Sequence, residues 1–222
     1  IYDGKPELQG LPAIYTEDPK EAQTLEILLE DSVMGAQIVL YYTIMRDYPA
    51  ITRSVKIRNY RDSHLRLTKA MSLCLDLPDR DYEWMQLSGA WARERHIKTR
   101  KLQQGIQAIG SIRGNSSHHH NPFVALKRPS ADECQGEVIA MSLIYSGNFI
   151  IQGEVDTYDV TRMLMGIHPT GFTWDLPAGE EFQTPEAVLV YSENGLNGMS
   201  QTFHKLFRTR LARGYWRDRE RP

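Results

Sequence analysis

The chain has 222 residues, 24% of them charged, and a formal net charge of −2 at pH 7. A chain of this length buries a substantial core, and its slightly acidic balance argues against nucleic acid as a partner. No apolar run approaches the roughly 20 residues of a membrane span, and no signal peptide opens the chain. We therefore expect a domain that binds neither nucleic acid nor membrane.

Period-two patterning dominates the chain after an irregular, glycine- and proline-rich start that ends near Lys20. Apolar residues alternate with polar ones, as in Leu25, Ile27 and Leu29, which indicates strands with one buried and one solvated face. Short strands separated by polar turns favour a β-sandwich. Strands are predicted at residues 25–29, 38–45, 51–58, 71–77, 138–145, 149–151, 163–165, 172–176 and 187–191.

Residues 92–102 are dense in charge, and alternation through Trp91, Arg93, Arg95 and Ile97 predicts a solvated surface strand. Two tryptophans precede this region. Trp84 and Trp91 offer a possible sugar-stacking platform, but burial of both rings in the sandwich is the favoured interpretation.

The pattern changes after Gly195. Apolar residues recur at three-, four- and five-residue steps, which is the spacing of one helical face. Arginines in the last turns complement the carbonyl end of the helix dipole, and Gly214 is the predicted stop. The helix should pack against something, such as a neighbouring domain. Its predicted buried face consists of Leu196, Met199, Phe203, Leu206 and Leu211.

Only two cysteines are present, Cys74 and Cys134, and they form no CxxC pattern. Neither a disulfide framework nor a zinc motif is indicated, so we expect a reducing compartment and a cytoplasmic location. The chain starts at Ile1 without a methionine and stops at Pro222 after a charged run. We expect both ends to be cut from a longer protein.

Residues 116–123 form the densest polar cluster, with two serines, His118, His119 and His120, and then Asn121-Pro122. A metal site is one hypothesis, but successive strand residues point to alternate faces and no acidic residue or cysteine lies in the segment. The structural alternative buries one imidazole on a backbone carbonyl, while Asn121-Pro122 fixes a turn. The third hypothesis is that these residues serve polar recognition at the domain surface or at a contact with another domain.

No catalytic constellation stands out. Ser116, His118 and Asp132 would supply a triad, but no GxSxG elbow is present. A glycosidase needs two facing carboxylates, and 28 acidic residues offer no way to choose a pair. Asp175 follows Trp174, but Phe172, Trp174 and Leu176 alternate as an inner strand face, so Asp175 should point away. No glycine-rich phosphate loop is present either.

Several short motifs, taken together and in order, resemble the amino-terminal domain of the bacterial family 36 α-galactosidases, which degrade raffinose and melibiose. The resemblance runs from Ile1 to Pro222. The motifs are Gly89-Ala90-Trp91 with Arg93-Glu94-Arg95, Arg113 to His118 with Asn121-Pro122-Phe123, Tyr145 to Phe149, Gly171-Phe172 with Trp174, Gly179-Glu180 with Phe182 to Glu186, and Tyr191-Ser192 with Gly195.

This resemblance implies an all-β fold, a galactose-mutarotase-like β-supersandwich with a C-terminal connecting α-helix. Residues 1–194 would be an N-terminally incomplete supersandwich domain, and 195–222 a linker helix towards a catalytic (β/α)8 barrel outside this chain. The complete enzyme would hydrolyse terminal α-galactosides with retention, as a homotetramer. The family's catalytic motifs are absent here, so the resemblance implies no catalytic residue, cofactor or metal in this chain.

Within that frame, His118, His119, His120 and Asn121 are the candidate domain-contact or substrate-rim residues. Two other functions stay open. A free-standing carbohydrate-binding module would end after Tyr191, whereas residues 196–213 read as a connector. A mutarotase-like enzyme would need a histidine and a glutamate converging in an open cleft.

Overall fold

The computed structural model describes residues 1–215 and 217–220 and consists mainly of antiparallel strands. None of the described helices is long and apolar enough to cross a membrane. The short η1 spans Pro19–Glu21 and α1 spans Gly195–Arg210. The strands are β1 Tyr2–Asp3, β2 Ala22–Asp31, β3 Ala36–Met45, β4 Ala50–Asn59, β5 Leu65–Leu67, β6 Met71–Leu77, β7 Glu83–Ala90, β8 Arg93–Lys101, β9 Gly105–Ser111, β10 His120–Lys127, β11 Val138–Ile144, β12 Phe149–Val155, β13 Thr161–Ile167, β14 Trp174–Leu176, β15 Glu181–Gln183 and β16 Glu186–Ser192.

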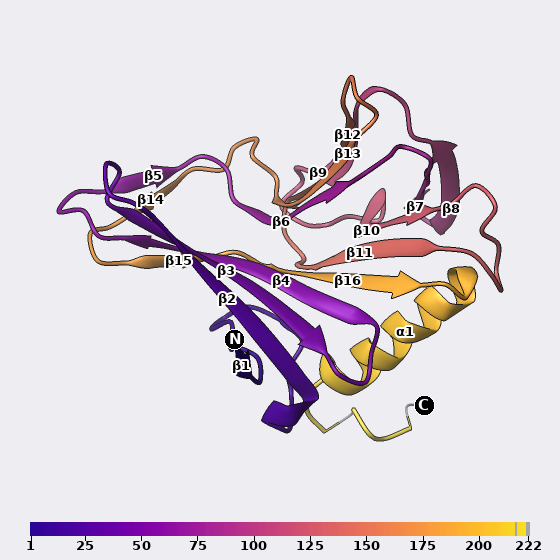
Figure 1. Cartoon of the computed structure of the whole chain (residues 1–222), viewed down its shortest axis with the longest axis horizontal. Helices are drawn as coiled ribbons and strands as arrows, with labels where there is room; N and C mark the ends of the chain where they lie inside the picture. The colour runs from indigo at the N-terminus through magenta and orange to yellow at the C-terminus, as the bar shows by residue number, and fades with distance from the viewer. Residues whose placement is uncertain (216, 221–222) are drawn as a thin grey trace.

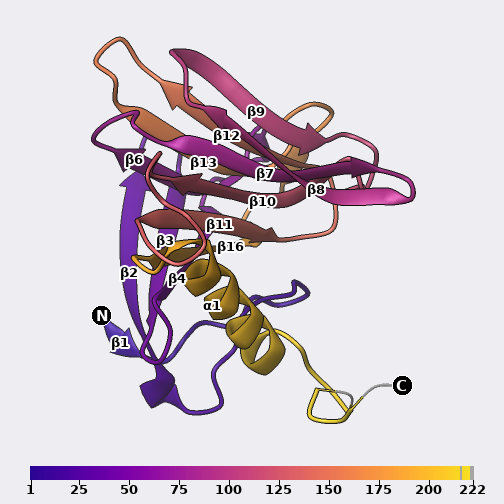
Figure 2. The same ribbon diagram turned by 90° about the vertical axis from the view of Figure 1, so that its right-hand side faces the viewer.

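These elements form three layers, seen edge-on in Figure 2. The described residues contain a ten-stranded sheet in the order β1-β2-β3-β4-β16-β11-β10-β7-β8, with β15 beside β4. A second sheet, β6-β13-β12-β9, covers one face of its β16–β7 half, and α1 lies across the opposite face (Figures 1 and 2). The predicted all-β sandwich with a C-terminal helix is confirmed.

The core between the two sheets is built from the inward residues of the alternating strands. Trp84, Phe149, Met163 and Met165 are fully buried there because the apolar set of every strand faces the same interior. The burial predicted for Trp84 is therefore confirmed. A separate core lies between the large sheet and α1.

The buried face of α1 is the one that the sequence spacing predicts. Met199, Phe203 and Leu206 are buried, and Leu196 and Leu211 pack partly against the same cluster. The helix ends at Arg210, however, one turn before the predicted stop at Gly214. Gly214 turns the chain after the helix instead, with φ of 82°.

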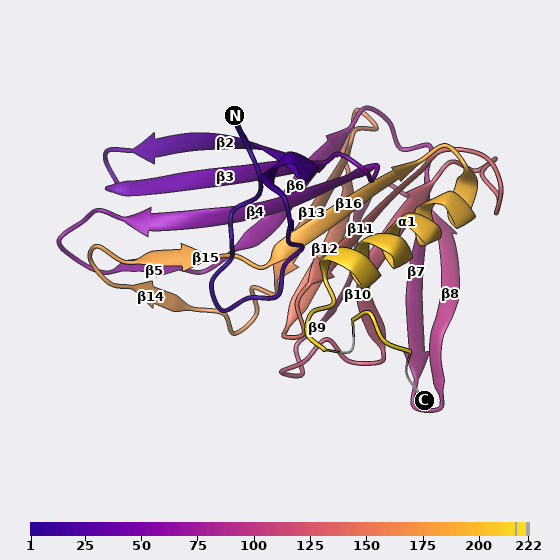
Figure 3. The same cartoon turned by 90° about the horizontal axis from the view of Figure 1, so that it is seen from below.

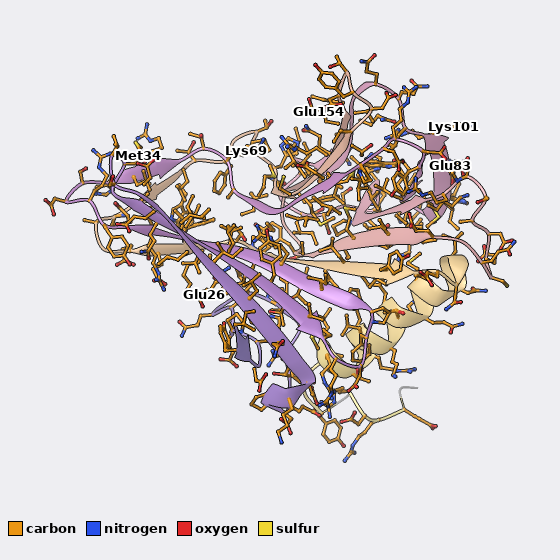
Figure 4. The ribbon with its side chains drawn as sticks, in the orientation of Figure 1. Glu26, Met34, Lys69, Glu83, Lys101 and Glu154 are labelled. Atoms are coloured by element: carbon orange, nitrogen blue, oxygen red, sulfur yellow. The ribbon has the colours of Figure 1, made fainter. Side chains whose placement is uncertain are left out.

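The outer ends of β2 and β3 project past the second sheet, with Met34 at the tip of their hairpin (Figures 3 and 4). Here the alternation is correct but the predicted burial is wrong. Leu25 and Leu29 are exposed, as are Ile38 and Ile44 on the neighbouring strand β3. The sequence pattern identified an apolar face, but the small β5–β14 sheet packs against it only near Ala36 and Ile57, and leaves Leu25 and Leu29 exposed.

The irregular N-terminal segment is tied to elements from the end of the chain. The buried Glu186 carboxylate accepts a hydrogen bond from the Ile14 backbone N–H at 2.7 Å and lies 2.5 Å from Lys5 Nζ. Glu21 accepts two hydrogen bonds from Arg210, at 2.8 and 2.7 Å, which fixes the end of α1 against η1.

Candidate functional site

The polar segment 116–123 folds as a tight turn that runs into a strand. The Ser116 N–H donates to the Ser146 carbonyl at 2.8 Å, and Ser117, at φ of 61°, accepts from the His119 N–H at 3.2 Å. The predicted turn at Asn121-Pro122 is wrong, because β10 already begins at His120. The register between β10 and β7 shifts between His120 and Val124, and this irregularity accommodates a proline that cannot donate to the ladder.

The three histidines meet different surroundings. His118 is exposed and its ring stands edge-on to that of His119, with centroids 4.7 Å apart. Nε2 of His119 lies 3.4 Å from the Arg113 guanidinium, which can only donate. Burial, together with the charges of Arg113 and His118, holds the pKa of His119 below its usual value. No imidazole among these three donates to a backbone carbonyl in the hydrogen bonds of the described residues, so that expectation is wrong.

His120 instead ends a chain of side-chain hydrogen bonds along one face of β7. Trp84 Nε1 donates to Gln86 Oε1 at 2.8 Å, and Gln86 Nε2 donates to Ser88 Oγ at 2.7 Å. Ser88 Oγ lies 2.9 Å from Nδ1 of His120. Burial, followed by the charges of His119 and Arg100, lowers the pKa of His120. The sequence interpretation missed Gln86 and Ser88, although their i, i+2, i+4 spacing from Trp84 puts all three on one face.

A shallow hollow of about 600 Å³ opens beside this chain, and we call it the basic hollow. Five of its side chains are basic or imidazole groups, contributed by β8, by the turn before β10 and by the first residue of β10. Its lining residues are Ser88, Gly89, Ala90, Arg93, His96, Lys98, His119 and His120.

Trp91 stands at the tip of the β7–β8 hairpin, next to the basic hollow. Its ring is 85% exposed, so the burial predicted for it is wrong. The tip places Ala92 at φ of 59°, and the Ala92 N–H donates to the Glu94 carboxylate at 2.9 Å. The hairpin therefore ends in a turn that pushes the indole away from the sheet. The surface strand predicted after it is confirmed as β8.

Asn121 faces the opposite side of the sheet from His120. It lines a second cavity of about 540 Å³, the helix groove, between the β7–β8–β10 face and α1. The Asn121 Oδ1 atom is buried and has no hydrogen-bond partner among the described residues. The groove is mostly apolar. Its main lining residues are Met85, Leu87, Ile97, Phe123, Phe203 and Phe207.

The acidic residues considered for catalysis from the sequence, Asp132 and Asp175, form structural hydrogen bonds instead. Asp132 accepts from the N–H groups of Cys134 and Gln135 at 2.7 and 3.0 Å, so its carboxylate closes a turn. Asp175 pairs with Arg66 across β14 and β5 at 2.7 Å, and this hydrogen bond lowers its pKa. The inner-face prediction holds for Leu176 but is wrong for Trp174, which is 49% exposed. The described residues contain no group of three or more His, Cys, Asp or Glu side chains arranged to hold a metal ion.

Comparison with protein families and with known proteins gives consistent matches along the whole chain. A model of the glycosyl hydrolase family 36 N-terminal domain matches residues 1–177, and the Melibiase model matches residues 181–222. The chain is 55% identical over 222 residues to alpha-galactosidase AgaA of Geobacillus stearothermophilus and 45% identical to Alpha-galactosidase 1 of Pediococcus pentosaceus. These matches cover 100% of this chain and 30% of each relative. The chain thus spans about 30% of the length of the curated relatives it matches.

Solved structures agree with the sequence matches. The crystal structure of a variant of G. stearothermophilus AgaA in complex with stachyose superimposes with a TM-score of 0.98 at 55% identity, over 100% of this chain and 31% of that one. The alpha-galactosidase from Lactobacillus brevis gives a TM-score of 0.97 at 40% identity, over 100% of this chain and 30% of that one.

Proposed function

The chain belongs to the glycosyl hydrolase family 36 N-terminal domain family, and from this premise we propose that it is the non-catalytic β-sandwich part of an α-galactosidase. The complete protein would hydrolyse terminal α-galactosides, such as melibiose and raffinose, with retention of configuration. Residues 1–194 would form the sandwich domain and 195–222 the link to a catalytic (β/α)8 barrel. The observation that carries the proposal is 55% identity to an α-galactosidase without a gap in coverage.

The state of the acidic residues supports a non-catalytic role. A retaining glycosidase needs two carboxyl groups about 5–5.5 Å apart, one of them held protonated as the general acid. Here Glu181 is bound by Lys56 and Arg58, and these contacts lower its pKa. The hydrogen bond from Arg66 lowers the pKa of Asp175 in the same way. Carboxylates stabilised in their ionised form are poor general acids. Burial raises the pKa of Glu186 instead, but this side chain is 1% exposed against Ile14 and Lys5, where no substrate reaches it. We therefore assign the chemistry to the barrel.

The helix groove supports a role in domain packing. An exposed apolar groove marks an interaction site, and a buried oxygen without a donor is uncommon in a finished structure. The phenylalanines of the helix groove form such an apolar surface, and Asn121 Oδ1 is such an oxygen. The barrel of the same chain would cover the groove and its phenylalanines. His118 and His119 would then lie at the contact or at the substrate rim, on the other side of the sheet.

The uncovered apolar face of β2 and β3 supports a role in oligomerisation. Leu25 and Leu29 lie beside Ile38 and Ile44 on this face, and exposed apolar patches of this kind mark protein contacts. A second copy of the protein, in a homotetramer, would cover it. The free thiols of Cys74 and Cys134 are exposed, which fits the reducing cytoplasm.

Enzymatic assay of two proteins tests this proposal. The full-length protein should release galactose from melibiose, raffinose and an aryl α-galactoside, while the separate 222-residue chain should release none. No turnover by the full-length protein would contradict the α-galactosidase assignment. Comparable turnover by the separate chain would contradict the non-catalytic role. A chain that binds galactosides tightly by itself would favour the carbohydrate-binding module.

A further inference from the structure

The chemistry of the hydrogen-bond chain on β7 determines where its protons lie. An indole N–H can only donate, so the Gln86 oxygen must face Trp84 and the Gln86 NH2 must face Ser88. Ser88 Oγ therefore accepts from Gln86. Its own hydrogen is then left to point at Nδ1 of His120, 2.9 Å away.

This direction of donation favours one tautomer of His120. An Nδ1–H ring would make Ser88 Oγ accept twice and leave the serine hydrogen without an acceptor in the chain, whereas an Nε2–H ring accepts that hydrogen at Nδ1. Nε2 itself makes no hydrogen bond to another described residue. A second proton on Nδ1 would deprive the serine hydrogen of its acceptor in the same way. The neighbouring charges of Arg100 and His119 disfavour that proton as well. His120 is thus a neutral ring that presents an N–H donor beside the basic hollow.

The other groups of the hollow are donors too. Arg93 and Lys98 lie on β8 and make no ion pair among the described residues, and His96 lies between them. Neither acidic side chain of the hairpin forms an ion pair with these cations. Glu94 accepts from the Ala92 N–H, and Glu83 pairs with Lys127 at 2.8 Å, at the far end of the hairpin from its tip. Cations without a counter-charge repel one another, and a bound anion relieves that repulsion. The hollow therefore favours binding of a negatively charged group.

We propose that the basic hollow is an oxyanion-binding site, in which Lys98 and Arg93 supply the charge and His120 Nε2–H supplies an oriented hydrogen bond to a phosphate or carboxylate group. Bonds between charged groups and oxygen anions are the stronger class of hydrogen bond, and a neutral donor held in one orientation adds direction to them. The proposal does not depend on where the catalytic residues lie, although His119 is shared with the contact or substrate-rim residues proposed above. A volume of about 600 Å³ admits a small anion with its remaining substituents in solvent.

Calorimetric titration of the 222-residue chain tests the site, with inorganic phosphate in one arm and acetate in the other, at constant ionic strength. Lys98→Gln should weaken binding at least fivefold. The matched control is Lys101→Gln, which removes the same charge from the same strand, but three residues away and so on the opposite face, outside the lining of the hollow. It should change affinity less than twofold. Binding in only one arm identifies phosphate or carboxylate as the ligand group.

A second variant tests the role of the hydrogen-bond chain. Ser88→Ala should lower anion affinity about threefold and convert His120 from the single Nε2–H tautomer to a mixture, as read from its imidazole nitrogen shifts. The proposal is overturned by absence of binding in both arms, by equal losses in Lys98→Gln and Lys101→Gln, or by an Nδ1–H tautomer in the unmodified chain. Thermal melts of each variant show whether a lost affinity reflects a lost fold.

Discussion

Replacing Phe203 by alanine should cost the chain about 3–4 kcal/mol of unfolding free energy. The side chain is 5% exposed at the centre of the α1 contact. Burial of such a ring contributes about 1.5–3 kcal/mol. Its ring also packs edge-on against Phe123 and Phe207, with centroids 5.7 and 5.3 Å away, and each pair adds about 0.5–1.5 kcal/mol. In the variant, α1 would move partly into the space left by the ring, which lowers the summed cost to the stated range.

Urea unfolding followed by tryptophan fluorescence measures the loss, because Trp84 is fully buried between the sheets and reports their separation. Gln201→Ala is the matched control. Gln201 lies on the exposed face of the same helix, so its truncation should change stability by no more than about 0.5 kcal/mol. A Phe203→Ala loss below about 1 kcal/mol would refute the assignment of α1 as part of this domain's core.

Two further predictions concern charge and exposure. Glu21→Gln should lower stability by about 1 kcal/mol near neutral pH, because it removes the hydrogen bonds from Arg210 that depress the Glu21 pKa below 4.5. A depressed carboxyl pKa stabilises the fold above the unfolded value and ceases to do so as pH falls through the folded value, so wild-type and variant melting temperatures should converge below about pH 4. Trp91→Ala should leave the melting temperature unchanged, since the ring is exposed, and a drop of several degrees would show that the hairpin tip is packed in the folded chain.

Strands and the terminal helix were predictable because their signal is local. Alternation in Met71–Leu77 and the stepped spacing of Met199, Phe203 and Leu206 each report one face of one element. Which apolar face another layer covers is not local. Leu25 and Trp91 lie in the same kind of apolar–polar alternation as the buried Trp84, yet both are exposed. Leu25 lies on β2, outside the β16–β7 half that the second sheet covers, and Trp91 lies in the turn between β7 and β8.

The candidate site was predictable only in part. The cluster of donors at 116–123 and the divergence of His120 from Asn121 follow from residue type and strand geometry. The hydrogen-bond partners of His120 could not be predicted in this way. Ser88 and Gln86 lie on another strand, and the β7–β10 register brings them to His120. Asn121-Pro122 reads as a turn in sequence. The segment forms strand nevertheless, because the register irregularity between His120 and Val124 requires no ladder hydrogen bond from the proline.

The pairing of β4 with β16 has a consequence for synthesis on the ribosome. Val55 of β4 binds Thr184, 129 residues later, and Ile14 binds Glu186 across 172 residues. At about 5–20 residues per second, the nascent hairpins of β2, β3 and β4 wait on the order of 10 s for the strand that completes their sheet. Throughout that interval β4 presents an unpaired edge beside apolar side chains. Early translation of this domain is therefore its most aggregation-prone stage, and the stage at which a chaperone would have most effect.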